Sequence, residues 1–197
     1  MNRRQILMSL SAAAAAQVVT PAMPQIPNTG GAGGRSGVSR VTAYAFSFKA
    51  LDGRDIPLSD HQNRPILVVN TASLCGFTPQ YAGLEQLWTR FRQRGLLVLG
   101  VPSNDFGGQE PGQASDISHT AHQYGVTFPL TEMVTVKGPN AHPFYRWAAV
   151  QRPGETPRWN FHKYLVGVDG MIAATFGSPA DPVSAPVVIA IEKTLAA

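Results

Sequence analysis

The sequence contains only one cysteine, Cys75, in 197 residues. A single cysteine excludes a disulfide bond within the chain. It also argues against a structural zinc site, because such sites draw several ligands from cysteine and histidine. Any sulfur chemistry must therefore be carried by this one thiol.

Charge is also scarce, since 14% of the residues are Asp, Glu, Lys or Arg and the formal net charge is +4. Arg3 and Arg4 supply two of these positive charges, in a segment that we expect to be removed. The mature protein is then only mildly basic, which argues against nucleic acid or an anionic membrane surface as a partner. The 44% hydrophobic content is that of a globular protein, and the length suffices for one domain with a full core.

The apolar stretch at residues 6–16 is too short and too rich in alanine to be a good membrane span. With Arg3 and Arg4 before it and small residues after it, residues 1–22 resemble an export signal peptide. The paired arginines followed by apolar residues resemble a twin-arginine signal, and an ordinary secretory signal is the alternative. Either signal predicts an exported protein, and we expect the bacterial periplasm, without stable insertion into the membrane.

Residues 23–40 are rich in Gly, Pro, Asn and Ser and contain almost nothing to bury, so we interpret them as a flexible tether. The folded domain is predicted over residues 41–197. This part of the sequence contains no internal repeat.

The first half of this domain predicts a hairpin and a βαβ unit. Asp52-Gly53 separates two apolar alternations, which is typical of a β-hairpin. Residues 65–70 and 96–101 are apolar at consecutive positions, as in strands that are covered on both faces. Between them, apolar residues three or four apart predict a helix with Thr78 as its N-cap and its end at Gly95. Strand, helix and strand in this order predict parallel strands with a right-handed crossover.

The second half predicts further helices at residues 114–124, 143–150 and 183–195. A short extended piece is expected to start at Phe128, and Asp169-Gly170 predicts a second hairpin. The order of all these elements predicts an α/β domain with a mixed central sheet and helices on both faces.

Cys75 lies in residues 70–80, a polar turn between the first buried strand and the long helix. In open α/β sheets, chemistry is done at the edge formed by the carboxyl ends of the strands. A cysteine near a helix N-terminus can be a nucleophile because the thiolate is favoured there, and the alternative is a small buried hydrophobic residue. The glycine-rich loop at residues 103–113 follows the second buried strand and is expected at the same edge.

A thiol that reduces a peroxide must be a thiolate near neutral pH, and it needs donors that stabilise charge on sulfur and on the leaving oxygen. Gln109 lies in the glycine-rich loop, and Trp159 and Asn160 open the segment that leads into the second hairpin. Each also has an ordinary structural interpretation. Gln109 is then a turn residue, Trp159 a core residue and Asn160 a turn or strand-end residue.

Three separated segments resemble motifs of the glutathione peroxidase family. Residues 70–81 are similar to its active-cysteine motif, residues 104–111 to its glutamine motif and residues 159–166 to its third signature. Residues 124–129 and 140–143 fit as well, and the resemblance extends from about Ala45 to the C-terminus. Several motifs in the right order are far more specific than one short pattern.

This resemblance implies a thioredoxin-like fold, with the mixed sheet flanked by helices and preceded by the N-terminal β-hairpin. It implies that Cys75 is the peroxidatic residue that attacks the O–O bond. Gln109, Trp159 and Asn160 fall on the positions of the three groups that hydrogen-bond the sulfur. The chemistry of the family passes through a sulfenic acid, and no metal, haem or flavin cofactor is implied.

The chain departs from the family in three places. Many cysteine-containing members carry a resolving cysteine where this chain has Thr120 and Ala121, and they often have another cysteine where this chain has Ser103. This chain therefore cannot use the cycle in which an internal disulfide forms and is reduced by thioredoxin. Only 13 residues separate Tyr145 from Trp159, where tetrameric animal members have a long insertion, so we expect a monomer with an open site.

The leading hypothesis is an antioxidant one-cysteine thiol peroxidase that reduces hydrogen peroxide or organic hydroperoxides. An external thiol, glutathione or a thioredoxin-like protein, would restore Cys75. The alternative is a redox sensor or thiol relay that passes oxidation from Cys75 to a partner protein. A third hypothesis is a structural or binding protein that keeps the fold without efficient turnover.

Overall fold

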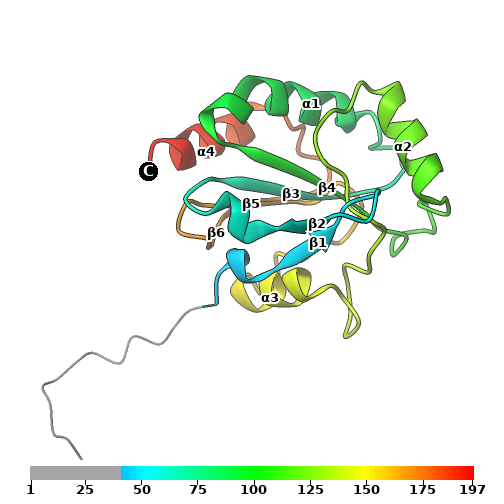
Figure 1. Cartoon of the computed structure of the whole chain (residues 1–197), viewed down its shortest axis with the longest axis horizontal. Coiled ribbons are helices and arrows are strands. Elements are labelled where there is room, and N and C mark those ends of the chain that lie inside the picture. The colour runs from blue at the N-terminus through cyan, green and yellow to red at the C-terminus, as the bar shows by residue number, and fades with distance from the viewer. Residues whose placement is uncertain (1–40) are drawn as a thin grey trace, which may run out of the picture. The chain divides into compact units, whose positions relative to one another are not determined.

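A four-stranded mixed sheet forms the centre of residues 41–197, the part of the chain that this computed structural model describes (Figure 1). In spatial order, its strands are β4 (Leu97–Pro102), β3 (Ile66–Thr71), β5 (Lys163–Val166) and β6 (Ile172–Phe176). β3 and β4 are parallel, β5 is antiparallel to β3, and β6 is antiparallel to β5. A separate hairpin pairs β1 (Ser47–Lys49) with β2 (Asp55–Pro57). The predicted mixed sheet and the N-terminal hairpin are thus confirmed.

Four α-helices accompany the sheet within the described residues. They are α1 (Gln80–Phe91), α2 (Ala114–Gln123), α3 (Pro143–Gln151) and α4 (Ala185–Leu195). Short 3-10 helices occupy Ala43–Ala45, Leu58–His61 and Arg92–Arg94. The predicted export signal at residues 1–22 and the predicted tether at residues 23–40 lie outside the described residues, and both stay predictions.

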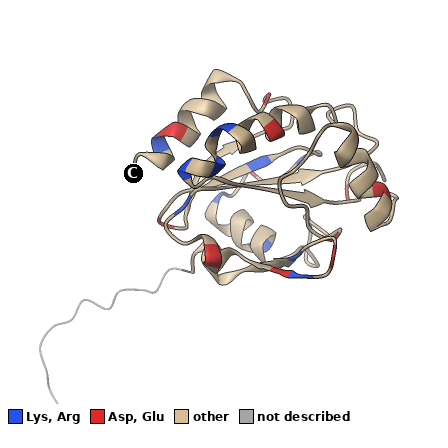
Figure 2. Ribbon diagram, turned by 45° about the horizontal axis from the view of Figure 1, so that its top comes forward, with Lys and Arg blue, Asp and Glu red and all other residues tan. Residues whose placement is uncertain are grey.

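The two faces of the sheet are covered by different helices, with α1 and α4 on one side and α3 on the other (Figure 1). All six residues of β3 are buried, so its consecutive apolar side chains serve both layers. Leu67 belongs to the cluster under α1 and α4, and Val68 belongs to the cluster under α3. Arg90 of α1 pairs with Glu192 of α4 at 2.8 Å, where charged segments of the two helices meet in Figure 2. The carboxyl ends of β3 and β4 are therefore held side by side by a core on each face.

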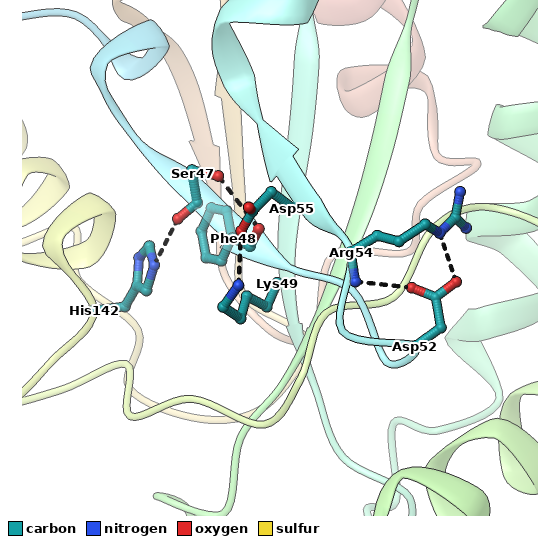
Figure 3. A network of polar contacts seen from close by, with 7 residues as sticks. All are labelled: Ser47, Phe48, Lys49, Asp52, Arg54, Asp55 and His142. Carbon is teal, nitrogen blue, oxygen red and sulfur yellow. Dashed lines mark hydrogen bonds and ion pairs between the residues drawn. The ribbon is translucent and has the colours of Figure 1, made fainter.

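The hairpin is attached to α3 through His142, as Figure 3 shows. The His142 Nδ1 accepts the Phe144 N–H at 3.3 Å and caps α3, so the other ring nitrogen, Nε2, donates to the Ser47 carbonyl at 3.1 Å. The ring also stacks on Phe48, with the centroids 4.1 Å apart. Burial lowers the pKa of His142, in agreement with a neutral ring that uses one nitrogen as donor and the other as acceptor.

The extended piece predicted at Phe128 does not form a strand. Its backbone makes only isolated bridges, through Leu130 to Gly100 of β4 and through Thr131 to Ala50. Pro129 lies between Phe128 and Leu130 and has no N–H to donate, which prevents a continuous ladder. The segment nevertheless lies close to β4. A Cβ atom added to Gly100 would be 2.4 Å from the Leu130 Cδ2 atom.

Candidate active site

Cys75 lies in the turn between the end of β3 and the start of α1, at the carboxyl edge of the sheet, as predicted. Its side chain is nearly covered, with a relative exposure of 6%. The sulfur accepts a hydrogen bond from the backbone N–H of Phe77, with the two atoms 3.4 Å apart. A backbone donor aimed at sulfur stabilises negative charge there without adding a charged side chain.

Thr78 fixes the shape of this turn. Its Oγ1 accepts the Cys75 N–H at 3.1 Å and lies 2.8 Å from the Ala72 carbonyl and 2.7 Å from the Cys75 carbonyl. The prediction that Thr78 is the N-cap of α1 is wrong, since the cap position is Pro79. Proline has no side-chain oxygen for a cap, so the threonine hydroxyl, one residue earlier, serves the cysteine turn instead.

Gln109 lies in the loop after β4, and this loop is bonded directly to the cysteine turn. The N–H of Leu74 donates to the Gln109 carbonyl at 2.9 Å. Gly107 and Gly108 have φ values of 67° and 65°, a left-handed conformation that favours glycine. Gly107 also comes close to Trp159, because a Cβ there would lie 3.2 Å from Cη2 of the indole ring. The loop therefore joins the cysteine turn to the Trp159 segment.

Asn160 is completely buried and bonds to this loop. Its Nδ2 donates to the Gln109 Oε1 at 3.0 Å and lies 3.5 Å from the Phe106 carbonyl. Through this bond to its oxygen, Asn160 orients the Gln109 amide.

Trp159 is the exposed member of the group, with 38% of its surface accessible. Its ring centroid lies 6.0 Å from that of Phe106, in a tilted arrangement. Its carbonyl accepts the Asn70 Nδ2 at 3.2 Å, which ties the segment to the end of β3. The Asn70 carbonyl also accepts the Phe161 N–H at 2.6 Å. Phe161 has a φ of 62°, a strained value for an aromatic residue, and this bend separates Trp159 and Asn160 from β5.

The structure thus brings Gln109, Trp159 and Asn160 together and links them to the Cys75 turn. Within residues 41–197, none of these three side chains donates a hydrogen bond to the sulfur in this arrangement, so their role at sulfur stays a prediction. Sequence reasoning missed Asn70, although a polar residue that closes a buried strand was a usable signal. It also missed the Phe77 N–H, which no side-chain pattern could indicate.

Two buried ionisable groups support the walls of the site. The Glu110 carboxyl, next to Gln109, accepts a hydrogen bond from the Ser73 hydroxyl at 3.1 Å, and burial raises its pKa. The Lys163 Nζ donates to the Gln80 Oε1 and to the Phe161 carbonyl, both at 2.7 Å. Burial lowers the pKa of Lys163 to about 8. These bonds connect β5 to the first residue of α1 and so stiffen the framework around Cys75.

The described residues contain no group of three or more His, Cys, Asp or Glu side chains that could hold a metal ion. No helix in this same part of the chain is long and apolar enough to cross a membrane.

Comparison with known proteins identifies the family. A model of the glutathione peroxidase family matches residues 43–149. The chain is 48% identical over 151 residues to a hydroperoxy fatty acid reductase from Synechocystis, covering 72% of this chain and 89% of that protein. It is 45% identical over 145 residues to a glutathione peroxidase-like peroxiredoxin from Chlamydomonas reinhardtii, covering 72% of this chain and 90% of that protein.

Solved structures agree with the sequence comparisons. The crystal structure of Trgpx in its apo form matches with a TM-score of 0.65 and 30% identity, covering 80% of this chain and 97% of that one. Thiol:disulfide interchange proteins from Chlorobium tepidum match at 14% and 16% identity, which shows the thioredoxin-like fold alone. The chain therefore belongs to the glutathione peroxidase family and is a glutathione peroxidase-like thiol peroxidase that reduces hydroperoxides.

Proposed function

We propose that Cys75 is the peroxidatic residue of this enzyme and that an external thiol regenerates it. The observation that supports this most strongly is the hydrogen bond between the Leu74 N–H and the Gln109 carbonyl at 2.9 Å. It places the only thiol of the chain beside the loop that Asn160 and Trp159 also contact. The Phe77 N–H already points to the sulfur.

In the first step, the Cys75 thiolate attacks the terminal oxygen of the hydroperoxide. A sulfur–oxygen bond forms as the O–O bond breaks, so the sulfur is oxidised and the peroxide is reduced. The leaving alkoxide takes a proton and departs as an alcohol, or as water when the substrate is hydrogen peroxide. The sulfur retains one OH group as a sulfenic acid. The Phe77 N–H, which is already bonded to the sulfur, stabilises the developing charge, and the Gln109 amide is the second donor that we propose for it.

In the second step, a small or protein thiol attacks the sulfenic acid. Water leaves and a mixed disulfide forms at Cys75. A second thiol then attacks this disulfide, releases the Cys75 thiol and carries away the new disulfide. Thr120 and Ala121 supply no resolving thiol, so both electrons come from outside the chain. Glutathione and a thioredoxin-like protein are the candidate reductants.

The substrates that we propose are hydrogen peroxide and organic hydroperoxides, including hydroperoxides of fatty acids. Two similar proteins from Synechocystis, at 48% and 41% identity, are hydroperoxy fatty acid reductases. We also propose that the enzyme is a monomer that is exported to the periplasm. The arginine pair at positions 3 and 4 supports export, and the short stretch between Tyr145 and Trp159 supports the monomer.

A steady-state assay of peroxide consumption with a panel of thiols tests this function. The wild-type enzyme should turn over with at least one small or thioredoxin-like thiol, and Cys75→Ser should be inactive, because serine has no accessible anion at neutral pH. Substantial activity of purified Cys75→Ser would contradict the proposal. Oxidation of Cys75 without turnover, together with a specific partner trapped on it, would favour the redox sensor.

A further inference from the structure

Glu110 is the only buried acidic residue in the part of the chain that the structure describes, with a relative exposure of 0%. None of the ion pairs among residues 41–197 includes it, and its Oε1 atom is buried without a hydrogen-bond partner there. Burial raises its pKa, its hydrogen bonding to Ser73 opposes this rise, and the charge of Asp116 adds to it. A buried carboxyl without a cation usually costs free energy of folding, which favours a role in function over a role in stability.

Glu110 joins the loop of Gln109 to the turn of Cys75. The Ser73 hydroxyl donates to the Glu110 Oε2 at 3.1 Å. The N–H of the next residue, Leu74, donates to the Gln109 carbonyl at 2.9 Å. Two consecutive residues of the turn are thus bonded to two consecutive residues of the loop. Since Cys75 follows directly in the chain, these two bonds fix the loop beside the nucleophile.

The position of Gln109 depends on such bonds because the two residues before it are glycines. Gly107 and Gly108 adopt a left-handed conformation and have no side chains that could anchor this half of the loop. On the other side of Gln109, the Glu110 N–H donates to the Asn104 Oδ1 at 2.9 Å and closes the loop. Glu110 therefore anchors the loop through its backbone as well as through its side chain.

The Glu110 carboxyl also lies near the first turn of α1. Burial raises the pKa of Tyr81, the second residue of this helix, and the charge of Glu110 adds to the rise, so the two groups are within range of each other. Tyr81 is itself buried and packs edge-on against Phe161, with the ring centroids 5.4 Å apart. The carboxyl is thus enclosed by the cysteine turn, α1 and its own loop.

We propose that Glu110 is a positioning residue for peroxide reduction, which holds Gln109 beside Cys75 through the Ser73 hydroxyl. The inference rests on the proposed roles of Cys75 and Gln109, and it adds the group that keeps this donor in place. Glu110 acts through Gln109, so its loss affects the steps that need the Gln109 amide. Reduction of a peroxide needs a donor for the developing charge on oxygen, whereas alkylation of the thiolate by iodoacetamide forms no such charge.

The first test breaks the link from each side. Glu110→Ala and Ser73→Ala should each slow oxidation of Cys75 by hydrogen peroxide about 10-fold, because even a small misplacement of a reacting group is costly. Alkylation by iodoacetamide should stay within about threefold of the wild-type rate, since the thiolate itself is unchanged. Stopped flow measures the oxidation, and intact mass measures the alkylation. The exposed Glu132→Ala and Ser118→Ala are the matched controls and should keep both rates.

The second test determines whether Glu110 acts through Gln109. In a Gln109→Ala background, adding Glu110→Ala should change the oxidation rate by less than about threefold, because the group that Glu110 positions is already gone. Glu110→Gln keeps an oxygen that can accept the Ser73 hydroxyl, so it should restore most of the rate lost in Glu110→Ala. If Glu110→Ala fails to fold, Ser73→Ala takes its place in this comparison, with Ser73→Thr as the variant that keeps the hydroxyl.

Unchanged oxidation rates in Glu110→Ala and Ser73→Ala would overturn the inference. Effects that multiply with Gln109→Ala, or that change alkylation as much as oxidation, would overturn it as well, because Glu110 would then support only the fold of the turn. A Gln109→Ala variant that reacts as fast as the wild type would remove its basis. In each of these cases, oxidation of Cys75 in the wild-type enzyme would leave the proposed peroxidase function standing, whereas absence of that reaction would contradict the function itself.

Discussion

Asn160 and Gln109 are hydrogen-bonded to each other, with the Asn160 Nδ2 3.0 Å from the Gln109 Oε1. This bond leaves the NH2 group of Gln109 as the free donor of the pair. We propose that Asn160 acts on the sulfur through Gln109, as a positioning residue, and that Gln109 contacts the sulfur when the peroxide reacts.

The first prediction follows from this bond. Gln109→Ala and Asn160→Ala should each slow oxidation of Cys75, because a preorganised donor is lost or misplaced, an effect of up to about 100-fold where charge develops strongly. The double variant should be within about threefold of the slower single variant, since both changes remove the same interaction. Stopped-flow oxidation with hydrogen peroxide measures all three, with exposed Gln86→Ala on α1 as the control. Independent, multiplying effects would show that Asn160 does not act through Gln109.

The second prediction concerns the turn that holds Cys75. Thr78→Val keeps the shape of the side chain but leaves the Cys75 N–H without its acceptor. We expect the free energy of unfolding to fall by about 1–3 kcal/mol, the usual cost of an unsatisfied buried polar group. Urea denaturation measures this change. The exposed Thr89→Val on α1 serves as the control and should alter stability by less than about 0.5 kcal/mol. Equal effects of the two substitutions would mean that Thr78 does not brace the turn.

The third prediction is a pH dependence of stability that arises from His162. Its pKa is about 4 in the folded protein, against 6.5 for an unperturbed histidine, because burial disfavours the charged ring. The unfolded chain therefore binds the extra proton between these pH values, and stability is lost as the pH falls from 6.5 towards 4. The full loss is about 3 kcal/mol. Urea denaturation of His162→Gln should lack this part of the pH dependence, while exposed His119→Gln should retain it. A His162→Gln curve parallel to that of the wild type would refute the assignment.

Much of the framework around Cys75 could be predicted from the sequence. Consecutive apolar residues predicted β3 and β4, and Asp52-Gly53 predicted the first hairpin, because these patterns depend on local burial and turn geometry. Gly95 was expected at the end of the first helical segment, and it has a φ of 105°. In each case, the pattern of neighbouring residues was sufficient to predict the element.

The details of the site could not be predicted in the same way. The donor to sulfur is a backbone group, the Phe77 N–H, which every sequence possesses. The left-handed φ of Phe161 contradicts its own preference and is imposed by contacts such as its bond to the Asn70 carbonyl. A cavity lined by Phe77, Trp159 and Pro179, among others, depends on segments that are distant along the chain, so no local pattern encodes it.

The fourth prediction concerns export. If Arg3 and Arg4 belong to a twin-arginine signal, changing both to lysine should leave the precursor in the cytoplasm, because that pathway reads the arginine pair. Cell fractionation followed by immunoblotting measures the distribution. Normal export of the double variant would favour an ordinary secretory signal.

The fifth prediction tests the one-cysteine cycle most directly, through the intact mass of the mature protein after titration with peroxide. Because oxidised Cys75 has no partner within the chain, one equivalent of peroxide without thiol should give a sulfenic acid or a sulfenamide, and excess should give sulfinic acid. With thiol present, a mixed disulfide at Cys75 should replace these products. Covalent dimers as the only product at every peroxide level would show that a second subunit resolves Cys75, and would contradict the cycle proposed for this enzyme.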